Sequence, residues 1–341
     1  MIAAGAQRAD DDAAWDAYVE RRPDACLGHA SMWRHVFANA YGIDSVRLEA
    51  RDGDGHLRGV LPLAPVRTLV GARSYVSLPF LDAAGVLCDD AEAESALLDA
   101  ARALGAPVEL RQAAPLATLP ISVATRVELW LALGGGEEAR WRALPGKVRN
   151  QTRKAWKEKL VVGDPSPRDV ADFCRVHRTA MRELGSPPHA EAFFRAVLSA
   201  FGARARCFVV RDGARAVGGL VAIEYAGVVT VPWASTLASE RSRCPNHALY
   251  WEALRWAESR GAHAFSFGRS PWNSGTHRFK KGWGATERPL HWIRIDARGA
   301  ATAAQSAGDS RPLQLLSRLW KQLPPTLCDR VGPLLRPRIS S

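Results

Sequence analysis

The sequence predicts an α/β protein in which helices pack on mixed sheets, and three observations lead to this fold class. Apolar residues recur at helical spacing in some segments and alternate as in strands in others. Gly- and Asp-rich turns separate the two kinds of segment. With 47% apolar and 24% charged residues, the 341-residue chain has the composition of a folded globular protein. This length accommodates about two domains, each with its own core.

The first half alternates helices with strands. Trp33, Val36 and Phe37 recur at helical spacing, and Gly42 follows where that helix should end. Residues 52–55 form an Asp-Gly-Asp-Gly turn between two strands. The expected helices are 11–20, 31–41 and 92–104, and the expected strands are 45–51, 57–66, 74–79, 108–111 and 126–133. They make up a first domain, residues 1–136, which ends at a run of three glycines.

The second half, residues 137–298, has the element order of an acyltransferase-type α/β unit. A long basic helical stretch at 137–160, interrupted by Pro145-Gly146, precedes two amphipathic helices, a three-strand meander, another helix and further strands. The expected helices are 168–184, 190–201 and 246–260, and the expected strands are 205–211, 216–225, 228–234, 264–267 and 290–295.

The tail, residues 299–341, contains an amphipathic basic segment at 313–323 that carries Leu315, Leu316, Leu319 and Trp320. This segment either docks on the body of the protein or attaches to an anionic membrane surface.

Charge and missing motifs narrow the possible functions. The chain carries 46 Lys+Arg and 35 Asp+Glu, a net charge of +11, which favours an anionic partner. Motifs of P-loop kinases, α/β-hydrolases, zinc proteases and dinucleotide-binding dehydrogenases are missing, and no cysteine pair has metal-ligand spacing, so we expect no metal site. Without a signal sequence or a transmembrane segment, the protein is expected to be cytoplasmic, with the tail as a peripheral contact to the inner membrane.

A first candidate site is the basic run at 144–160. On a helix, Arg149, Arg153 and Lys157 share one face, while Lys147 and Lys154 lie seven residues apart on another. Like charges four residues apart repel each other, so the run indicates an anionic ligand such as phosphate, pyrophosphate or an RNA backbone. The alternative is a well-solvated helix face.

Two further candidate sites follow strands. After the strand that is expected to end at Gly268, a loop places Arg269 and Ser270 near Lys280, Lys281 and Trp283. Such groups suit a polyphosphate or an oxyanion, although a basic surface loop over packed tryptophans is the plainer interpretation.

The other site lies between a strand ending at Trp233 and a helix that Asn246 is expected to cap. A helix N-terminus beside a strand end can bind pyrophosphate or an acyl carbonyl. His247 and Glu224 are the candidate general bases.

At these residues the chain resembles FemAB-like proteins of the GNAT acyltransferase superfamily, and in particular the subgroup associated with exosortase/PEP-CTERM and exopolysaccharide systems. The resemblance spans about residues 12–335 and is carried by LPGKVRNQTRKAWKEKL, FSFGRS and FKKGWG in that order. It implies two tandem GNAT-like units, each a mixed, mostly antiparallel sheet flanked by helices. It also implies transfer of an acyl or aminoacyl group to an amine or hydroxyl of a cell-envelope polysaccharide or peptidoglycan precursor.

The resemblance also suggests roles for the candidate residues. The family's lysine matches Lys280, with Lys281 beside it, so these two are the expected catalytic residues that offset negative charge. The expected substrate-binding residues are Arg149, Arg153, Trp233, Asn246, Arg269, Ser270 and Trp283. We expect no bound cofactor, and the acyl donor is aminoacyl-tRNA or acyl-CoA. Asn246 stands where GNAT enzymes that use acyl-CoA carry a glycine, which weakens the case for acyl-CoA.

A non-catalytic binding module is the alternative. It would use the same fold to hold an anionic polysaccharide precursor or RNA during export. Basic residues interleaved with Trp141, Trp156, Trp272 and Trp283 suit RNA stacking as well as phosphate binding.

Overall fold

The computed structural model describes residues 2–7, 12–67, 71–119, 124, 126–304 and 311–339. The chain forms two compact units, the first from residues 1–127, 288–307 and 337–341, the second from residues 128–287 and 308–336. These units divide the chain differently from the domains expected at 1–136, 137–298 and 299–341. Residues 288–295 belong to the first unit because they continue a strand that pairs there, and the tail helices belong to the second.

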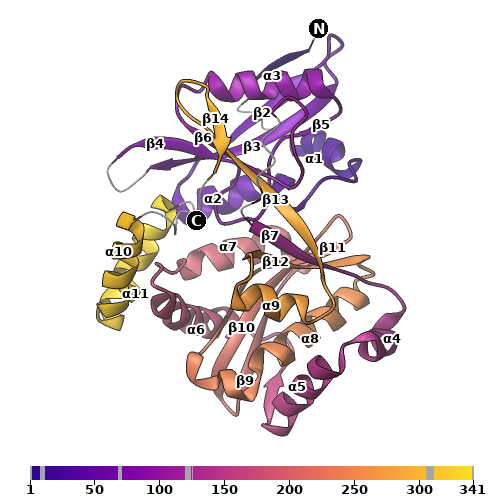
Figure 1. Cartoon of the computed structure of the whole chain (residues 1–341), viewed down its shortest axis with the longest axis vertical. Coiled ribbons are helices and arrows are strands. Elements are labelled where there is room, and N and C mark those ends of the chain that lie inside the picture. Colours follow the sequence, from indigo (N-terminus) through magenta and orange to yellow (C-terminus); the bar gives the residue numbers. More distant parts are fainter. Residues whose placement is uncertain are drawn as a thin grey trace. The chain divides into compact units, whose positions relative to one another are not determined.

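The first unit is a mixed sheet covered by helices (Figure 1). Its strands lie in the order β1-β2-β3-β4-β6-β13, with β5 paired to β3 and β14 to β13. The strands are β1 (Ala3–Gln7), β2 (Val46–Arg51), β3 (Leu57–Arg67), β4 (Arg73–Val76), β5 (Leu87–Cys88), β6 (Val108–Gln112), β13 (Thr286–Ile295) and β14 (Ala301–Ala303). The helices are α1 (Asp12–Glu20), η1 (Leu27–His29), α2 (Trp33–Tyr41) and α3 (Ala91–Arg102).

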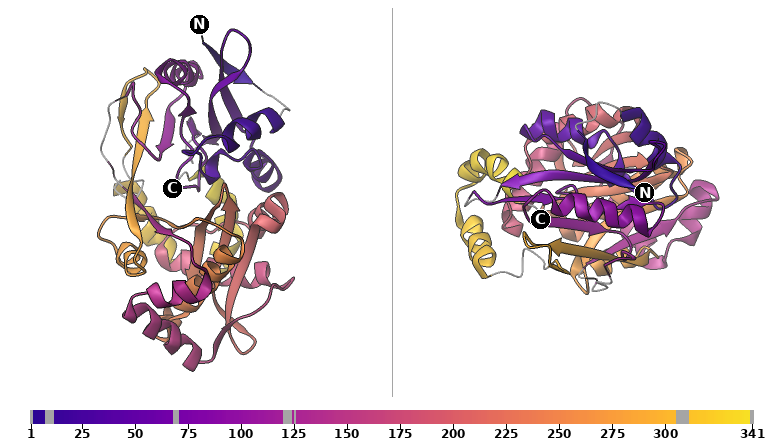
Figure 2. Two further views of the ribbon diagram at one scale, coloured as in Figure 1. Left: turned by 90° about the vertical axis from the view of Figure 1, so that its right-hand side faces the viewer. Right: turned by 90° about the horizontal axis from the view of Figure 1, so that it is seen from above.

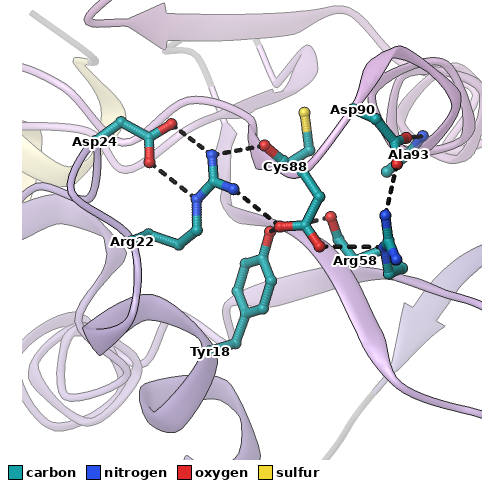
Figure 3. Close-up of polar contacts among 8 residues, drawn as sticks. Tyr18, Arg22, Asp24, Arg58, Cys88, Asp90 and Ala93 are labelled. Carbon is teal, nitrogen blue, oxygen red and sulfur yellow. Dashed lines mark hydrogen bonds and ion pairs between the residues drawn. The ribbon is translucent and has the colours of Figure 1, made fainter.

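A polar network fastens α1 to the sheet of this unit (Figure 3). The Tyr18 hydroxyl donates to Asp89 Oδ1 at 2.9 Å, and the Arg58 carbonyl oxygen lies 3.0 Å from the same hydroxyl. Arg22 donates to Asp89 and to the Cys88 carbonyl, and Arg58 pairs with Asp89. Burial, and then the hydrogen bond to Asp89, raise the pKa of the Tyr18 phenol, which keeps it a neutral donor. These contacts give the network a structural role.

The second unit contains six strands and all of the predicted catalytic and substrate-binding residues. Its strands lie in the order β7-β12-β11-β10-β9-β8; β11 and β12 pair in parallel, whereas β10 with β11, β9 with β10 and β8 with β9 are antiparallel. The strands are β7 (Arg126–Ala132), β8 (Leu160–Val162), β9 (Ala205–Asp212), β10 (Arg215–Tyr225), β11 (Val228–Thr236) and β12 (Ala264–Pro271). The helices are α4 (Gly136–Ala143), α5 (Gly146–Lys157), α6 (Asp169–Leu184), α7 (Glu191–Phe201), η2 (Gly202–Arg204), η3 (Ala238–Arg243), α8 (Pro245–Ser259), α9 (Gly275–Lys281), α10 (Arg311–Gln322), α11 (Pro325–Leu335) and η5 (Arg336–Arg338).

Two adjacent glycines of β10 show how the helices cover this sheet. Successive residues of a strand face opposite sides. A side chain at Gly218 would meet Leu249 of α8, and one at Gly219 would come within 2.8 Å of Phe173 of α6. Helices α6 and α8 therefore lie on opposite faces, and the glycines let both approach closely. Figure 2 shows the unit from two further directions.

The predicted fold class, α/β with mostly antiparallel sheets flanked by helices, is confirmed. Several boundaries differ. The strand expected at 74–79 ends at Val76, shortly before Leu78 and Phe80 adopt positive φ angles. The predicted helix at 11–20 is α1, although Asp11 itself lies outside the described residues.

The segment after β12 is another difference. It was expected to be an open loop, but its second half is helix α9, which Ser274 caps by accepting a hydrogen bond from the His277 amide. Helix α11 was also not predicted, and Pro325 at its first turn marks its start. No helix within the described ranges combines the length and apolar character needed to cross a bilayer.

The N-cap of α3 supports a stability prediction. Asp90 accepts a hydrogen bond from the Ala93 amide at 2.9 Å, and this bond, together with Arg58, lowers the pKa of the Asp90 carboxyl. Asp90→Ala should lower the free energy of unfolding by about 1 kcal/mol at neutral pH. Because the pKa is lower in the folded state than the unfolded value of about 3.9, the charged cap stabilises above that value and its contribution disappears as pH falls through the acid range.

The matched control is Asp90→Asn, which keeps a capping oxygen but cannot titrate. Urea unfolding of both variants and the parent chain, followed from neutral pH to about pH 3, measures the effect. The advantage of the parent chain over Asp90→Asn should shrink as the pH falls, and a difference that stays constant would contradict the assignment.

Candidate functional site

The central feature of the second unit is the place where β11 and β12 separate. The two strands pair only at Val228–Ala264, Val229–Phe265 and Thr230–Ser266. Beyond these pairs, β11 continues to Thr236 and β12 to Pro271 with no further pairing between them, and both strands lie wholly within the described residues.

Irregular backbone on both strands accounts for the separation. Opposite β10, the register of β11 shifts between Trp233 and Thr230, so Val231 and Pro232 form a bulge. Bulges bend a strand, and Pro232 fits there because proline has no N–H for the ladder. On β12, Gly268 has a φ of +72° just beyond the last pair. The prediction that this strand ends at Gly268 was therefore wrong: Arg269 and Ser270 belong to the strand.

Lys280 of α9 stabilises the separated end of β12. Its ammonium group is buried and donates to the Gly268 carbonyl at 3.1 Å and to the Arg269 carbonyl at 2.7 Å. Unpaired buried carbonyls are costly, so the lysine satisfies groups near the point where the strands part. A fixed positive charge thus lies at this strand end. The adjacent Lys281 points elsewhere, is exposed, and pairs with Glu287 at 2.9 Å.

The α6/α7 side of the separated β11 end is aromatic and contains two buried histidines. Trp233 packs edge-on against His189 and Phe193, and Ser235 Oγ lies 3.0 Å from His177 Nδ1. Burial, followed by the charge of Arg336, lowers the pKa of His177 to about 3 and that of His189 well below its usual range. Both imidazoles are therefore neutral at physiological pH. Their residue pattern did not single them out in the sequence, although His177 lies one turn from Phe173 on the apolar face of its helix.

The N-terminus of α8 lies on the other side of the sheet, beside α5. Lys147 is near enough to His247 to act on its ionisation: burial, and then this charge, lower the pKa of His247 to about 4. Burial raises the pKa of the Cys244 thiol, while the charge of Lys154 opposes that rise. Lys147 and Lys154 are both exposed. Two lysines thus lie beside a helix N-terminus, where the helix dipole also favours anions.

The arginines predicted to bind an anion also have contacts within the protein. Arg149 donates to the carbonyls of Arg142 and Leu144, and the Arg153 guanidinium lies over the Trp141 ring. Of the two faces predicted for this helix, the one with Lys147 and Lys154 carries the charges that act on His247 and Cys244 at the start of α8. The sequence could not decide between these faces because the choice depends on packing against α8.

Three other predicted residues also differ from expectation. Asn246 makes no cap for α8: the N-cap is Cys244, with φ +64°, and Pro245 is the first helical residue. Trp283 is only 1% exposed and packs against His247, Phe267 and Tyr250, as a core residue. Glu224 lies at the opposite end of β11 from the separation, beside Val229.

Ser270 lies at the separated end of β12, on the strand and not on a loop after it, and is buried. Its hydroxyl has no hydrogen-bond partner among the described residues. A buried hydroxyl without a partner is uncommon, so Ser270 is available to a bound group in this region.

Comparison with known proteins agrees with this geometry. Residues 146–281 match the acetyltransferase (GNAT) domain family. That range runs from the start of α5 to the end of α9 and so includes the separated strands and the α8 N-terminus. A search of curated proteins found no match.

Three solved structures have a similar fold. FemX is 13% identical, with 90% of this chain and 98% of that chain covered and a TM-score of 0.62. A tandem GNAT protein from the clavulanic acid biosynthesis pathway is 12% identical over 87% of this chain and 99% of that one, with a TM-score of 0.56. The C-terminal domain of a putative lysylphosphatidylglycerol synthetase from Agrobacterium fabrum is 13% identical over 82% and 90%, with a TM-score of 0.55. The expected tandem GNAT-like fold is thus confirmed.

The contacts of Lys280 predict a difference between the two neighbouring lysines. Lys280→Met should lower the free energy of unfolding by about 2 kcal/mol, because two carbonyls lose a charged donor. Lys281→Met is the matched control and should change it by less than about 0.5 kcal/mol. Urea denaturation at neutral pH measures both. Equal effects of the two substitutions would mean that Lys280 does not hold the strand end.

The position of Lys147 predicts a measurable pKa change. Lys147→Gln removes one of the two causes that lower the pKa of His247, so this pKa should rise from about 4 toward 6.5. Histidine NMR signals followed between acid and neutral pH measure it. Lys159→Gln, at an exposed lysine beyond the end of α5, is the control and should leave the His247 titration in place. If the His247 pKa changes equally in both variants, the change does not come from a position of Lys147 beside the α8 N-terminus.

Proposed function

We propose that the chain is an acyltransferase that moves an acyl or aminoacyl group onto an amine or hydroxyl of an anionic cell-envelope precursor. The observation that carries the proposal is the separation of β11 and β12 inside the segment that matches the GNAT domain family. It leaves strand backbone without strand partners beside the unpartnered Ser270 hydroxyl and the fixed charge of Lys280.

The reaction is a direct attack on an ester or thioester carbonyl. The acceptor nitrogen or oxygen forms a bond to the carbonyl carbon, the bond from that carbon to the donor oxygen or sulfur breaks, and the acceptor proton leaves with the donor hydroxyl or thiol. The chain contributes orientation of the two reactants and stabilisation of the developing oxyanion. Lys280 supplies positive charge to the strand end, while Ser270 provides a hydroxyl that can donate to the acceptor.

Lys147 and Lys154 are proposed to hold the anionic part of the donor. Two neighbouring features favour a donor held by side-chain charges, such as aminoacyl-tRNA, over acyl-CoA held by backbone amides. Pro245 removes an amide from the first turn of α8, and Arg243 is already engaged by Asp212 and Glu240. Phosphates along an RNA backbone can contact separate lysines without a nest of amides.

The acceptor class is proposed from the names of structures with this fold and from the family resemblance. One of the structures with this fold is named a putative lysylphosphatidylglycerol synthetase, a name that refers to an aminoacylated phospholipid, and another is FemX. An acceptor of the cell envelope suits that lipid name and is also the acceptor class that the resemblance to FemAB-like proteins implies. The narrower assignment to the exosortase/PEP-CTERM-associated subgroup, with an exopolysaccharide acceptor, stays a prediction from the sequence.

RNA binding without catalysis is the second candidate, and one observation favours it. Trp156 is exposed at 44% and stacked on Trp141 at 5.4 Å between ring centroids, with the basic residues of α5 around it. Exposed aromatic rings among cations can stack with single-stranded bases.

The test is an assay of transfer from labelled acetyl-CoA or from labelled bulk aminoacyl-tRNA into a cell-envelope fraction. The double variant Lys147→Gln/Lys154→Gln should raise the KM for the productive donor by about tenfold or more and change kcat by less than about twofold, because both lysines act in binding. Lys159→Gln is the matched control and should keep the parental KM.

Two outcomes would count against the proposal. If neither donor supports transfer while bulk tRNA binds with a steep salt dependence, the binding module is the better description. If transfer occurs and the double variant keeps the parental KM, the α8 N-terminus is not the donor site.

A further inference from the structure

Helices α10 and α11 expose an unusual amount of apolar surface. Nine large apolar side chains are exposed among the described residues, and five of them lie on these two helices: Leu315, Leu316, Leu319, Leu327 and Leu334. A sixth, Leu184, is followed by Gly185, which lies directly against Ser317 of α10. Single exposed leucines are ordinary, whereas a group of this kind marks an interaction surface.

The leucines cannot turn inward because the other side of each helix is already packed. Trp320 of α10 and Cys328 of α11 are buried, and Gly332 fits against Pro188 and Trp320. Arg182 of α6 donates to the Leu323 carbonyl at 3.1 Å. Both helices contact α6 and lie side by side in Figure 1 and in the right-hand view of Figure 2.

The exposed leucines are aligned along each helix. Leu315 and Leu319 are one turn apart on α10, and Leu327 and Leu334 are two turns apart on α11. Each helix therefore presents an outward apolar row.

The charged residues around these rows are mostly basic. Arg318, Lys321 and Arg330 are exposed on the two helices. Asp329 is the one acid between residues 311 and 339, and it pairs with Arg178 of α6 at 3.6 Å. An amphipathic surface with this composition suits the interface of an anionic bilayer, where leucines enter the acyl region and long basic side chains reach phosphate groups.

We propose that α10 and α11 form a docking surface for an anionic phospholipid bilayer. Charge decides between this partner and a second copy of the chain. A symmetric contact through these helices would bring their basic residues together, whereas a bilayer of phosphatidylglycerol supplies the opposite charge. The surface is separate from the α8 N-terminus and does not depend on the proposed acyl transfer.

The test is flotation of the purified full-length chain with vesicles of phosphatidylglycerol or of phosphatidylcholine. Binding to phosphatidylglycerol should be at least about tenfold stronger and should weaken as salt increases. Leu315→Gln/Leu319→Gln should reduce it about tenfold or more, because two outward leucines lose their place in the acyl region. Arg318→Gln/Lys321→Gln should remove most of the preference for phosphatidylglycerol.

Val161→Gln is the matched control, since Val161 is an exposed aliphatic residue on β8. It should bind vesicles like the parent chain, and circular dichroism should confirm that every variant keeps its helices. Equal binding to both lipids, or unchanged binding after the leucine substitutions, would overturn the proposal. A third outcome would also overturn it. If the parent chain binds no vesicles but forms a dimer in sedimentation, and the leucine substitutions abolish that dimer, the surface is an interface between copies.

Discussion

The separation of β11 from β12 is the constraint on which the site depends. A parallel pair that stops after three residues leaves backbone donors and acceptors that would otherwise be satisfied by a neighbouring strand. Pro232 on β11 has no backbone N–H and therefore offers no donor there. Lys280 donates to two carbonyl acceptors on β12. The bulge and the positive φ of Gly268 therefore accompany the separation of the strands, and the buried Lys280 satisfies carbonyls near it.

The distribution of positive charge follows from the same packing. A net charge of +11 means that many side chains could bind an anion. Several arginines of the second unit, however, contact carboxylates, carbonyls or aromatic rings of the protein itself. Arg149 binds carbonyls, Arg153 covers an indole, and Arg243 joins Asp212 to Glu240. Lysines, which have a compact charge on a flexible stem, remain exposed beside the α8 N-terminus.

Local patterns in the sequence predicted most helices and strands, because apolar spacing reports which face of a segment is buried. They failed where structure depends on distant partners. Lys280 was singled out as a catalytic residue, yet its buried contacts with β12 depend on the tertiary placement of α9. Trp283 was expected to bind substrate because it lies in a basic segment, but Phe267 and Tyr250 enclose it. His177 was passed over because an isolated histidine on an amphipathic helix resembles any core residue until Ser235 is brought beside it.

The two sides of the sheet near the separation differ in their electrostatics. On the α8 side, the exposed Lys147 and Lys154 lie next to a helix N-terminus. On the α6/α7 side, burial and the charge of Arg336 hold His177 and His189 in the neutral form, among aromatic rings. An amine brought against that neutral side would lose hydration, which lowers its pKa and favours the uncharged, nucleophilic form. The proposed anionic donor and the proposed amine acceptor have opposite requirements, and a sheet with one cationic and one apolar side would meet both within a single unit.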